Sequence, residues 1–244
     1  MAKSNCRRSR LRWPTSFSAA SNRKRAKARP TVDNLSNIAE GIRAAFVTKN
    51  AARDTAIARS REVIRHCAEA IRAVHRREWA DAEAKLASAR AAADDMRAGI
   101  DGHPDLYHAG YTQDALKEVV EAFATSAIIR GQPLPTPDAL AVEPSTYLNG
   151  LAEAATELRR FILDILRRED GDTAEAERLL EWMDDIYDQL VTFDFPDAIT
   201  GGLRRQTDVV RGVLERTRGD LTTTVQQQRL QAALKRAENR LPDS

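Results

Sequence analysis

The sequence predicts an all-α protein built as a single bundle-like domain of long helices. Charged residues make up 30% of the chain and aromatic residues only 5%. This composition favours helices over a β-sandwich, which needs more β-branched and aromatic side chains. Apolar residues recur at the spacings of three and four that mark one face of a helix, and no segment alternates as a strand would. Short connections between the periodic segments favour one bundle.

Helical segments follow one another from residue 33 to residue 240. The first carries a long apolar stripe, which begins with Ile38, Ile42 and Phe46 and continues through Cys67 and Val74. Residues 51–98 contain no glycine or proline, so the helices there can be long. The predicted segments are residues 33–77, 79–96, 112–130, 145–168, 173–193 and 201–240, and the last can hold one helix or two.

A proline-rich connection separates the third and fourth predicted helices. Gly131 follows the third helix at the position that a C-terminal glycine prefers. Pro133, Pro135, Pro137 and Pro144 then mark a loop. Inside this loop, a threonine directly before Pro137 can cap one short helical turn, because proline is favoured at the first helical position.

The charge of the chain is unevenly distributed. Residues 1–30 carry ten lysines and arginines and no acid, whereas the rest of the chain carries 28 basic and 36 acidic residues. The N-terminal segment has few apolar residues, so it is predicted to be a disordered basic arm, and residues 31–244 form the helical domain. The arm is either an electrostatic tether for nucleic acid or a solvated tail, which includes the case of an unused upstream start codon.

Several classes of protein are excluded by what the sequence lacks. The two cysteines, Cys6 and Cys67, give neither a disulfide framework nor a CxxC motif. No apolar run approaches the roughly 18 residues that span a membrane, and the basic N-terminus has no apolar core of a signal peptide. Phosphate-loop, zinc-protease and serine-hydrolase motifs are also missing. We therefore expect a soluble, cytoplasmic protein without a membrane partner.

Two pairs of glutamates suggest a metal site. Glu118 and Glu121 lie three residues apart, and Glu153 and Glu157 lie four apart, so each pair occupies one side of its helix. Four carboxylates from two facing helices can hold Mg²⁺, which binds oxygen ligands. On a helical wheel, however, both pairs lie opposite the apolar stripes of their helices. The alternative is therefore two ordinary solvated faces.

A row of arginines suggests a surface for nucleic acid. Arg61, Arg65, Arg72 and Arg76 follow at spacings of four, seven and four, which keeps them on one stripe of a helix. Their guanidinium groups can bind backbone phosphates. The alternative is a helix whose arginines form salt bridges with neighbouring acids at the surface.

At these same residues the chain resembles the translin/Trax family. LKEVVEA (Leu116 to Ala122) is similar to that family's LQEYVEA signature, and the Arg59–Arg76 segment matches its LSRD…LHR helix. The segment from Tyr147 to Arg160 resembles the family's DYLLGVADLTGELMR motif. The resemblance implies a fold of about seven helices that assembles into a hollow, octamer-like barrel of identical chains. It also implies binding of single-stranded RNA and DNA.

The resemblance further implies an Mg²⁺-dependent endoribonuclease. The family's carboxylates fall on Glu118, Glu121 and Glu153, which would be the catalytic residues, and all three together with Glu157 would bind Mg²⁺. At Glu153 the family has aspartate, whose side chain is one methylene shorter. Because Mg²⁺ requires near-ideal octahedral geometry, this difference bears on the cleavage rate.

We therefore expect cleavage of single-stranded RNA, with single-stranded DNA as a second substrate. One alternative is a translin-like oligomer that binds RNA or DNA without cutting it. Another is a structural helical adaptor that has no affinity for nucleic acid.

Overall fold

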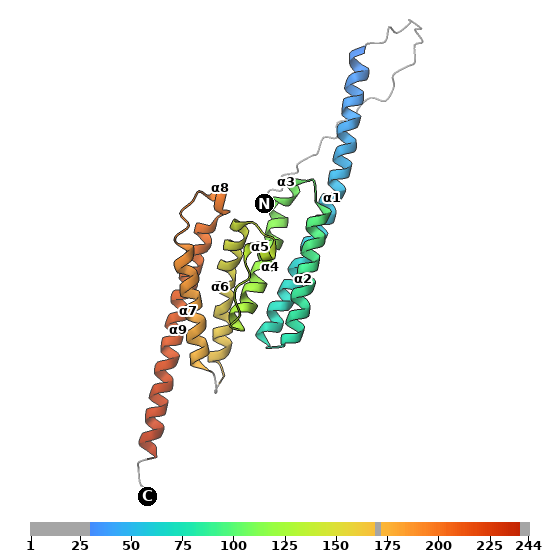
Figure 1. The fold of residues 1–244 in the computed structure, drawn as a ribbon. Coiled ribbons are helices and arrows are strands. Elements are labelled where there is room, and N and C mark those ends of the chain that lie inside the picture. The colour runs from blue at the N-terminus through green and yellow to red at the C-terminus, as the bar shows by residue number, and fades with distance from the viewer. Residues whose placement is uncertain (1–29, 169–171, 240–244) are drawn as a thin grey trace, which may run out of the picture. The chain divides into compact units, whose positions relative to one another are not determined.

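In a computed structural model of the chain, residues 30–168 and 172–239 are described, with side chains from Asn34 on. All regular elements within these residues are helices, as the sequence predicts (Figure 1). The helices are α1 (Pro30–His75), α2 (Trp79–Gly99), α3 (Pro104–Tyr107), α4 (Gly110–Ile129), α5 (Pro137–Leu140), α6 (Pro144–Leu166), α7 (Thr173–Leu190), α8 (Asp197–Thr200) and α9 (Leu203–Glu238).

The six long helices correspond to the six predicted segments, and the last segment holds a single long helix, α9. The short turn predicted in the proline-rich loop is α5. The Thr136 hydroxyl accepts a hydrogen bond from the Ala139 N–H at 3.1 Å and so caps it. The other two short helices, α3 and α8, were not predicted, because four residues are too few to show a helical period.

The chain divides into two units, residues 1–44 and residues 45–244. Of the first unit, only the beginning of α1 is described. The basic arm predicted for residues 1–30 lies almost entirely outside the described residues, so its disorder and its boundary stay predictions. In α1 the helix is as expected, but the apolar side chains of Ile38, Ile42 and Phe46 are exposed rather than buried.

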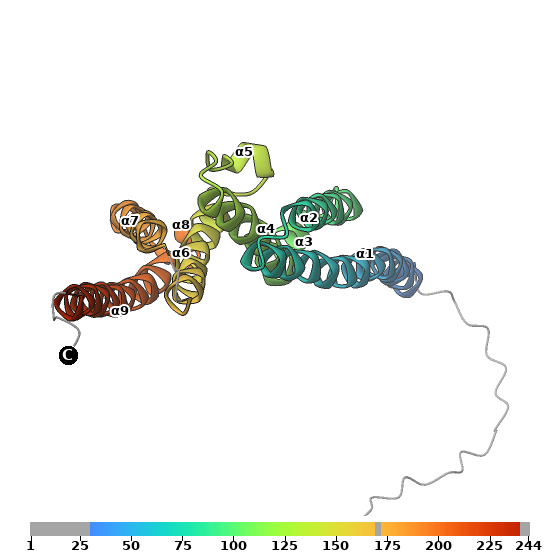
Figure 2. The ribbon, with the colours of Figure 1, turned by 90° about the horizontal axis from the view of Figure 1, so that it is seen from below.

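Two helices, α4 and α6, lie at the centre of the second unit (Figures 1 and 2). On one side, α4 shares a core cluster with α2 and the second half of α1, which includes Val63, Cys67 and Val120. On the other side, α6 packs against α7 and α9 around a cluster that includes Leu158 and Met183. The contact between α4 and α6 thus lies between two packed groups of helices.

Gly150 of α6 lies at the close contact between α4 and α6. A Cβ atom at this position would lie 2.6 Å from Val120 Cβ and 2.7 Å from the carbonyl oxygen of Lys117, both on α4. Only glycine therefore allows the two helices to approach this closely. The contact lies one turn or less from Glu121 on α4 and from Glu153 on α6.

Among the described helices, none is both long enough and apolar enough to cross a membrane.

Candidate metal centre

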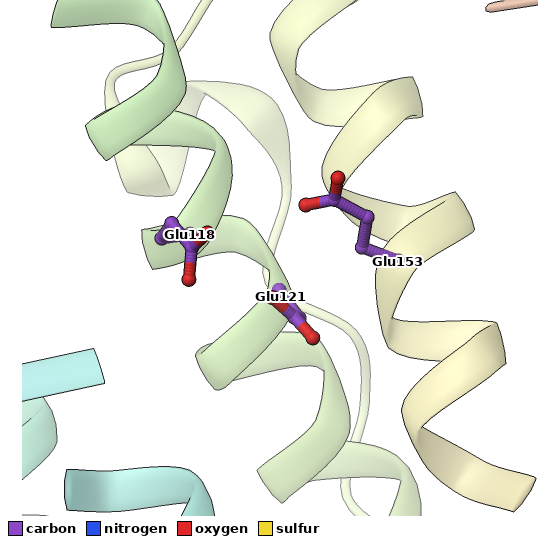
Figure 3. Close-up of side chains that lie close together, drawn as sticks. All are labelled: Glu118, Glu121 and Glu153. Atoms are coloured by element: carbon purple, nitrogen blue, oxygen red, sulfur yellow. The ribbon is translucent and has the colours of Figure 1, made fainter. Parts of the chain in front are cut away.

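Three of the four predicted carboxylates converge between α4 and α6. One carboxylate oxygen from each of Glu118, Glu121 and Glu153 lies within 4.8 Å of the other two. In Figure 3, Glu153 projects from α6 toward α4, on which Glu118 and Glu121 lie one turn apart. Two oxygens bound to one Mg²⁺ ion lie about 3–4 Å apart, given Mg–O distances near 2.1 Å. Small side-chain rotations would therefore let the three share an ion.

The carboxylates do not lie on the two solvated faces that the helical wheels allowed. All three side chains are half-buried. Neighbouring residues on α4, Val119 and Val120, are both buried, so this helix is enclosed on more than one side. A single apolar stripe does not reveal that a helix is covered on two sides. For this reason the helical wheel allowed the glutamates to lie on a solvated face.

Burial and crowding of like charges shift the carboxyl pKa values upward. The pKa of Glu121 is raised to about 8, first because the group is buried and then because Glu118 and Glu153 place negative charge beside it. Burial, followed by the charge of Glu153, also raises the pKa of Glu118. In the absence of a metal ion, the cluster therefore retains a proton at neutral pH.

Two residues that were not predicted contact Glu153 directly. The Lys117 ammonium lies 2.7 Å from Glu153 Oε1, and the Gln206 side chain of α9 donates a hydrogen bond to the same oxygen at 3.1 Å. Burial acts to lower the pKa of Lys117, but its hydrogen bond with Glu153 and the nearby negative charges outweigh burial and raise it. The sequence pattern around Glu153 does not indicate Gln206 as its partner, because the two residues are 53 positions apart.

Glu157 lies beside the cluster and is bound by a buried histidine. His75 Nε2 is 2.6 Å from Glu157 Oε1, and His75 Nδ1 is 3.6 Å from a carboxylate oxygen of Asp164. The charge of Glu157 still contributes to the raised pKa of Glu121. Glu157 is not one of the three carboxylates that converge, and its role as a fourth metal ligand stays a prediction.

The four predicted arginines are all exposed, three of them on α1 and Arg76 directly after its last residue. Arg76 is paired with Glu78 and Asp81, which agrees with the alternative of a salt-bridged helix at that position. Among the described residues, no acidic oxygen lies within 4.0 Å of Arg61 or Arg72. The fourth arginine, Arg65, is 4.0 Å from Glu62.

The arginine stripe points away from the carboxylates of α4 and α6. It lies on one side of α1, and the carboxylates lie next to another side. Cys67 is fully buried, and its pKa is raised first by this burial and then by the charges of Glu118 and Glu121, so it faces the carboxylates. At about 100° per residue, the stripe is centred roughly 150° around α1 from Cys67. Within one chain, the four arginines therefore do not line the carboxylate cluster.

Solved structures show the same fold with substantial sequence identity. The crystal structure of AfC3PO is 36% identical and superposes with a TM-score of 0.70, covering 76% of this chain and 95% of that chain. The chain belongs to the translin/C3PO family. An AfC3PO complex with duplex RNA matches at 35% identity and a TM-score of 0.66, with the same coverage. Apo-NeC3PO, 19% identical with a TM-score of 0.65 over 82% of this chain and 100% of that chain, supports the fold alone.

An uncharacterized protein of Methanocaldococcus jannaschii is 30% identical over 194 residues, which is 79% of this chain and 85% of that protein. No family model matches the sequence.

Beside the carboxylates, this translin-family chain has a pocket of about 610 Å³. Its wall includes Lys117 and Gln206, the two residues that contact Glu153, so the pocket adjoins the cluster. Arg205 and His108 also line it, as do Asp114 and Glu143. Ligand pockets in proteins are commonly of this size. The pocket thus gives a polar approach to the carboxylates.

The raised pKa of Glu121 predicts how the stability of this translin-family chain depends on pH without metal. Between about pH 4.5 and pH 8 the folded chain holds a proton on Glu121 that the unfolded chain has released. Stability is therefore lost as the pH rises through this range, by up to about 5 kcal/mol, since each pKa unit corresponds to about 1.4 kcal/mol. Thermal unfolding in EDTA at a series of pH values measures this loss. The Glu121→Gln variant should show a flatter profile, and equal slopes in both proteins would contradict the assignment.

Proposed function

We propose that this chain is an Mg²⁺-dependent endoribonuclease that cleaves single-stranded RNA and, as a second substrate, single-stranded DNA. The convergence of Glu118, Glu121 and Glu153 from two helices carries the proposal. Their oxygens are the ligands that Mg²⁺ prefers, and the raised pKa of Glu121 reflects its burial among other carboxylates, which a bound cation would offset. A bound Mg²⁺ would polarise the phosphodiester and lower the pKa of an attacking water.

The residues of the chain divide into holding and orienting roles. Glu118, Glu121 and Glu153 would hold the ion, and Gln206 orients Glu153 by its hydrogen bond. Glu157 would be a fourth ligand or would accept the proton of the attacking water, since His75 holds it beside the cluster. In the adjoining pocket, Arg205 would bind a backbone phosphate of the strand.

The substrate class has two supports. The family member AfC3PO has been crystallised with duplex RNA, which supports RNA binding by this chain. The carboxylates here are half-buried between helices, and a flexible single strand can enter such a site more readily than a stiff duplex. We therefore assign cleavage to single strands.

The arginine stripe is proposed as a separate phosphate-binding surface on the outer side of α1. Arg61 and Arg72, which have no acidic partner in the part of the chain that the structure describes, should contribute most. The Arg61→Gln/Arg72→Gln variant should lower the slope of log affinity against log salt by about 1.4, because each lost phosphate contact on a single strand is worth roughly 0.7. Fluorescence anisotropy with a labelled oligoribonucleotide in a salt series measures the slope.

The control for this prediction is Arg76→Gln. Arg76 belongs to the same stripe, but Glu78 and Asp81 already neutralise its charge, so its loss should change the slope little. Equal changes in the double variant and the control, or no change in either, would remove the stripe from the binding surface.

We also propose that identical chains assemble into a hollow, octamer-like barrel. Large apolar side chains are exposed in the second unit, including Phe46, Phe195 and Ile199, and contact between chains would bury them. Light scattering should give a mass near eight times that of the 27.1 kDa chain, and the mass of a single chain would contradict the barrel.

The nuclease proposal is tested with a labelled single-stranded oligoribonucleotide incubated with Mg²⁺ or with EDTA. We expect cleavage with Mg²⁺, none with EDTA, and retention of the strand in both. Retention without cleavage in Mg²⁺ would instead favour a non-catalytic translin-like oligomer. If the protein does not retain the strand in a salt-sensitive way, the remaining alternative is a structural helical adaptor that does not bind nucleic acid.

A further inference from the structure

The most unusual feature of the carboxylate cluster is a lysine inside it. Lys117 lies on α4 directly before Glu118, and its ammonium is 2.7 Å from Glu153 on the facing helix. The side chains of Lys117 and Glu153 are only 22% and 23% exposed, so water screens this ion pair weakly. The positive charge of Lys117 also acts on Glu118 and Glu121, where it opposes the rise in pKa.

We propose that Lys117 is a built-in counter-cation that occupies Glu153 in the metal-free protein and must release it before a divalent ion can bind all three carboxylates. This inference rests on the proposed metal site. The geometry supports it because the oxygen of Glu153 that Lys117 contacts is also the oxygen that accepts the hydrogen bond from Gln206. An ion bound through that oxygen would therefore compete with both partners for its lone pairs.

Displacement would give the lysine a second position. Lys117 also lines the pocket beside the cluster, together with Arg205 and His108. An ammonium released from Glu153 would still be held at this wall by its own backbone. There it can bind a backbone phosphate of the strand, because lysine binds phosphate as a mobile point charge. Lys117 is therefore a positioning residue for Glu153 that competes with the metal ion.

A substitution at this position can isolate the charge. Lys117→Gln removes the ammonium that contacts Glu153 without a large change in side-chain volume.

The test measures the affinity for Mn²⁺, a probe for Mg²⁺, by calorimetry without nucleic acid. Lys117→Gln should bind Mn²⁺ about tenfold more tightly than wild type, because a competitor and a repelling charge are both removed. Lys117→Arg, which keeps the charge, should remain within about twofold of wild type. Lys85→Gln is the matched control, since Lys85 forms a comparable pair with Glu69 at 2.8 Å.

A second readout distinguishes competition from a merely structural role. In EDTA, Lys117→Gln should unfold at a lower temperature than wild type, and saturating Mn²⁺ should remove most of the difference. If wild type binds Mn²⁺ and Lys117→Gln binds it with equal or weaker affinity, the proposed role of Lys117 is overturned, whereas the metal site itself is not. Absence of Mn²⁺ binding in wild type and in all variants would overturn both this role and the proposed nuclease site.

Discussion

Replacing Glu121 with alanine is expected to reduce Mg²⁺-dependent cleavage of single-stranded RNA by at least about 100-fold while leaving binding of the strand largely intact. Glu121 is one of three carboxylates whose oxygens lie within 4.8 Å of one another. Its loss would leave two ligands and lower the affinity for the ion that activates water. Its removal also relieves crowding of negative charge, so the protein should fold normally.

The matched control for this prediction is Glu181→Ala. Glu181 is an exposed glutamate of α7 and is not among the three carboxylates that converge. Cleavage rates under single-turnover conditions and strand affinities in EDTA should be measured for both variants. Cleavage by Glu121→Ala at the rate of the control would mean that the catalytic residues have been misassigned.

Replacing Gly150 with alanine is expected to destabilise the protein by about 2 kcal/mol, although alanine normally favours helices. The added methyl group would lie 2.6 Å from Val120 Cβ and 2.7 Å from the Lys117 carbonyl oxygen. Both distances are too short for contact, so α4 and α6 would move apart. The same movement would separate Glu121 from Glu153 and weaken metal binding.

The control for Gly150→Ala is Gly219→Ala in α9. Gly219 is exposed, and no heavy atom lies within 4 Å of the position of its added Cβ. This substitution should therefore stabilise the helix by about 0.5–1 kcal/mol. Thermal and denaturant unfolding compare the two variants. A Gly150→Ala protein as stable as Gly219→Ala would show that α4 and α6 are not held by this close contact.

Much of the fold could be predicted because long helices carry their signal locally. The stripe through Cys67 and Val74, and the cap at Thr136, depend on neighbours within one or two turns. The enclosure of α4 could not be predicted in this way. Its periodicity showed one apolar face, whereas the structure covers the helix on a second side and half-buries Glu118 and Glu121.

The partners within the site depend on contacts between distant parts of the chain. The motif resemblance selected Glu118, Glu121 and Glu153, but the hydrogen bonds from Gln206 and His75 join helices far apart in sequence. Exposure of the arginine stripe followed from its spacing. The separation of this stripe from the carboxylates required the packing of α1, which shows that Cys67 faces α4.

Binding of Mn²⁺, followed by electron paramagnetic resonance, tests most directly whether the three carboxylates share an ion. The wild-type chain should bind Mn²⁺ at one site to which Glu118, Glu121 and Glu153 all contribute. Glu121→Gln and Glu153→Gln should each weaken this binding by at least about tenfold, whereas Glu181→Gln should leave it unchanged. Binding of equal strength in all four proteins would show that the ion is held elsewhere or by none of these groups.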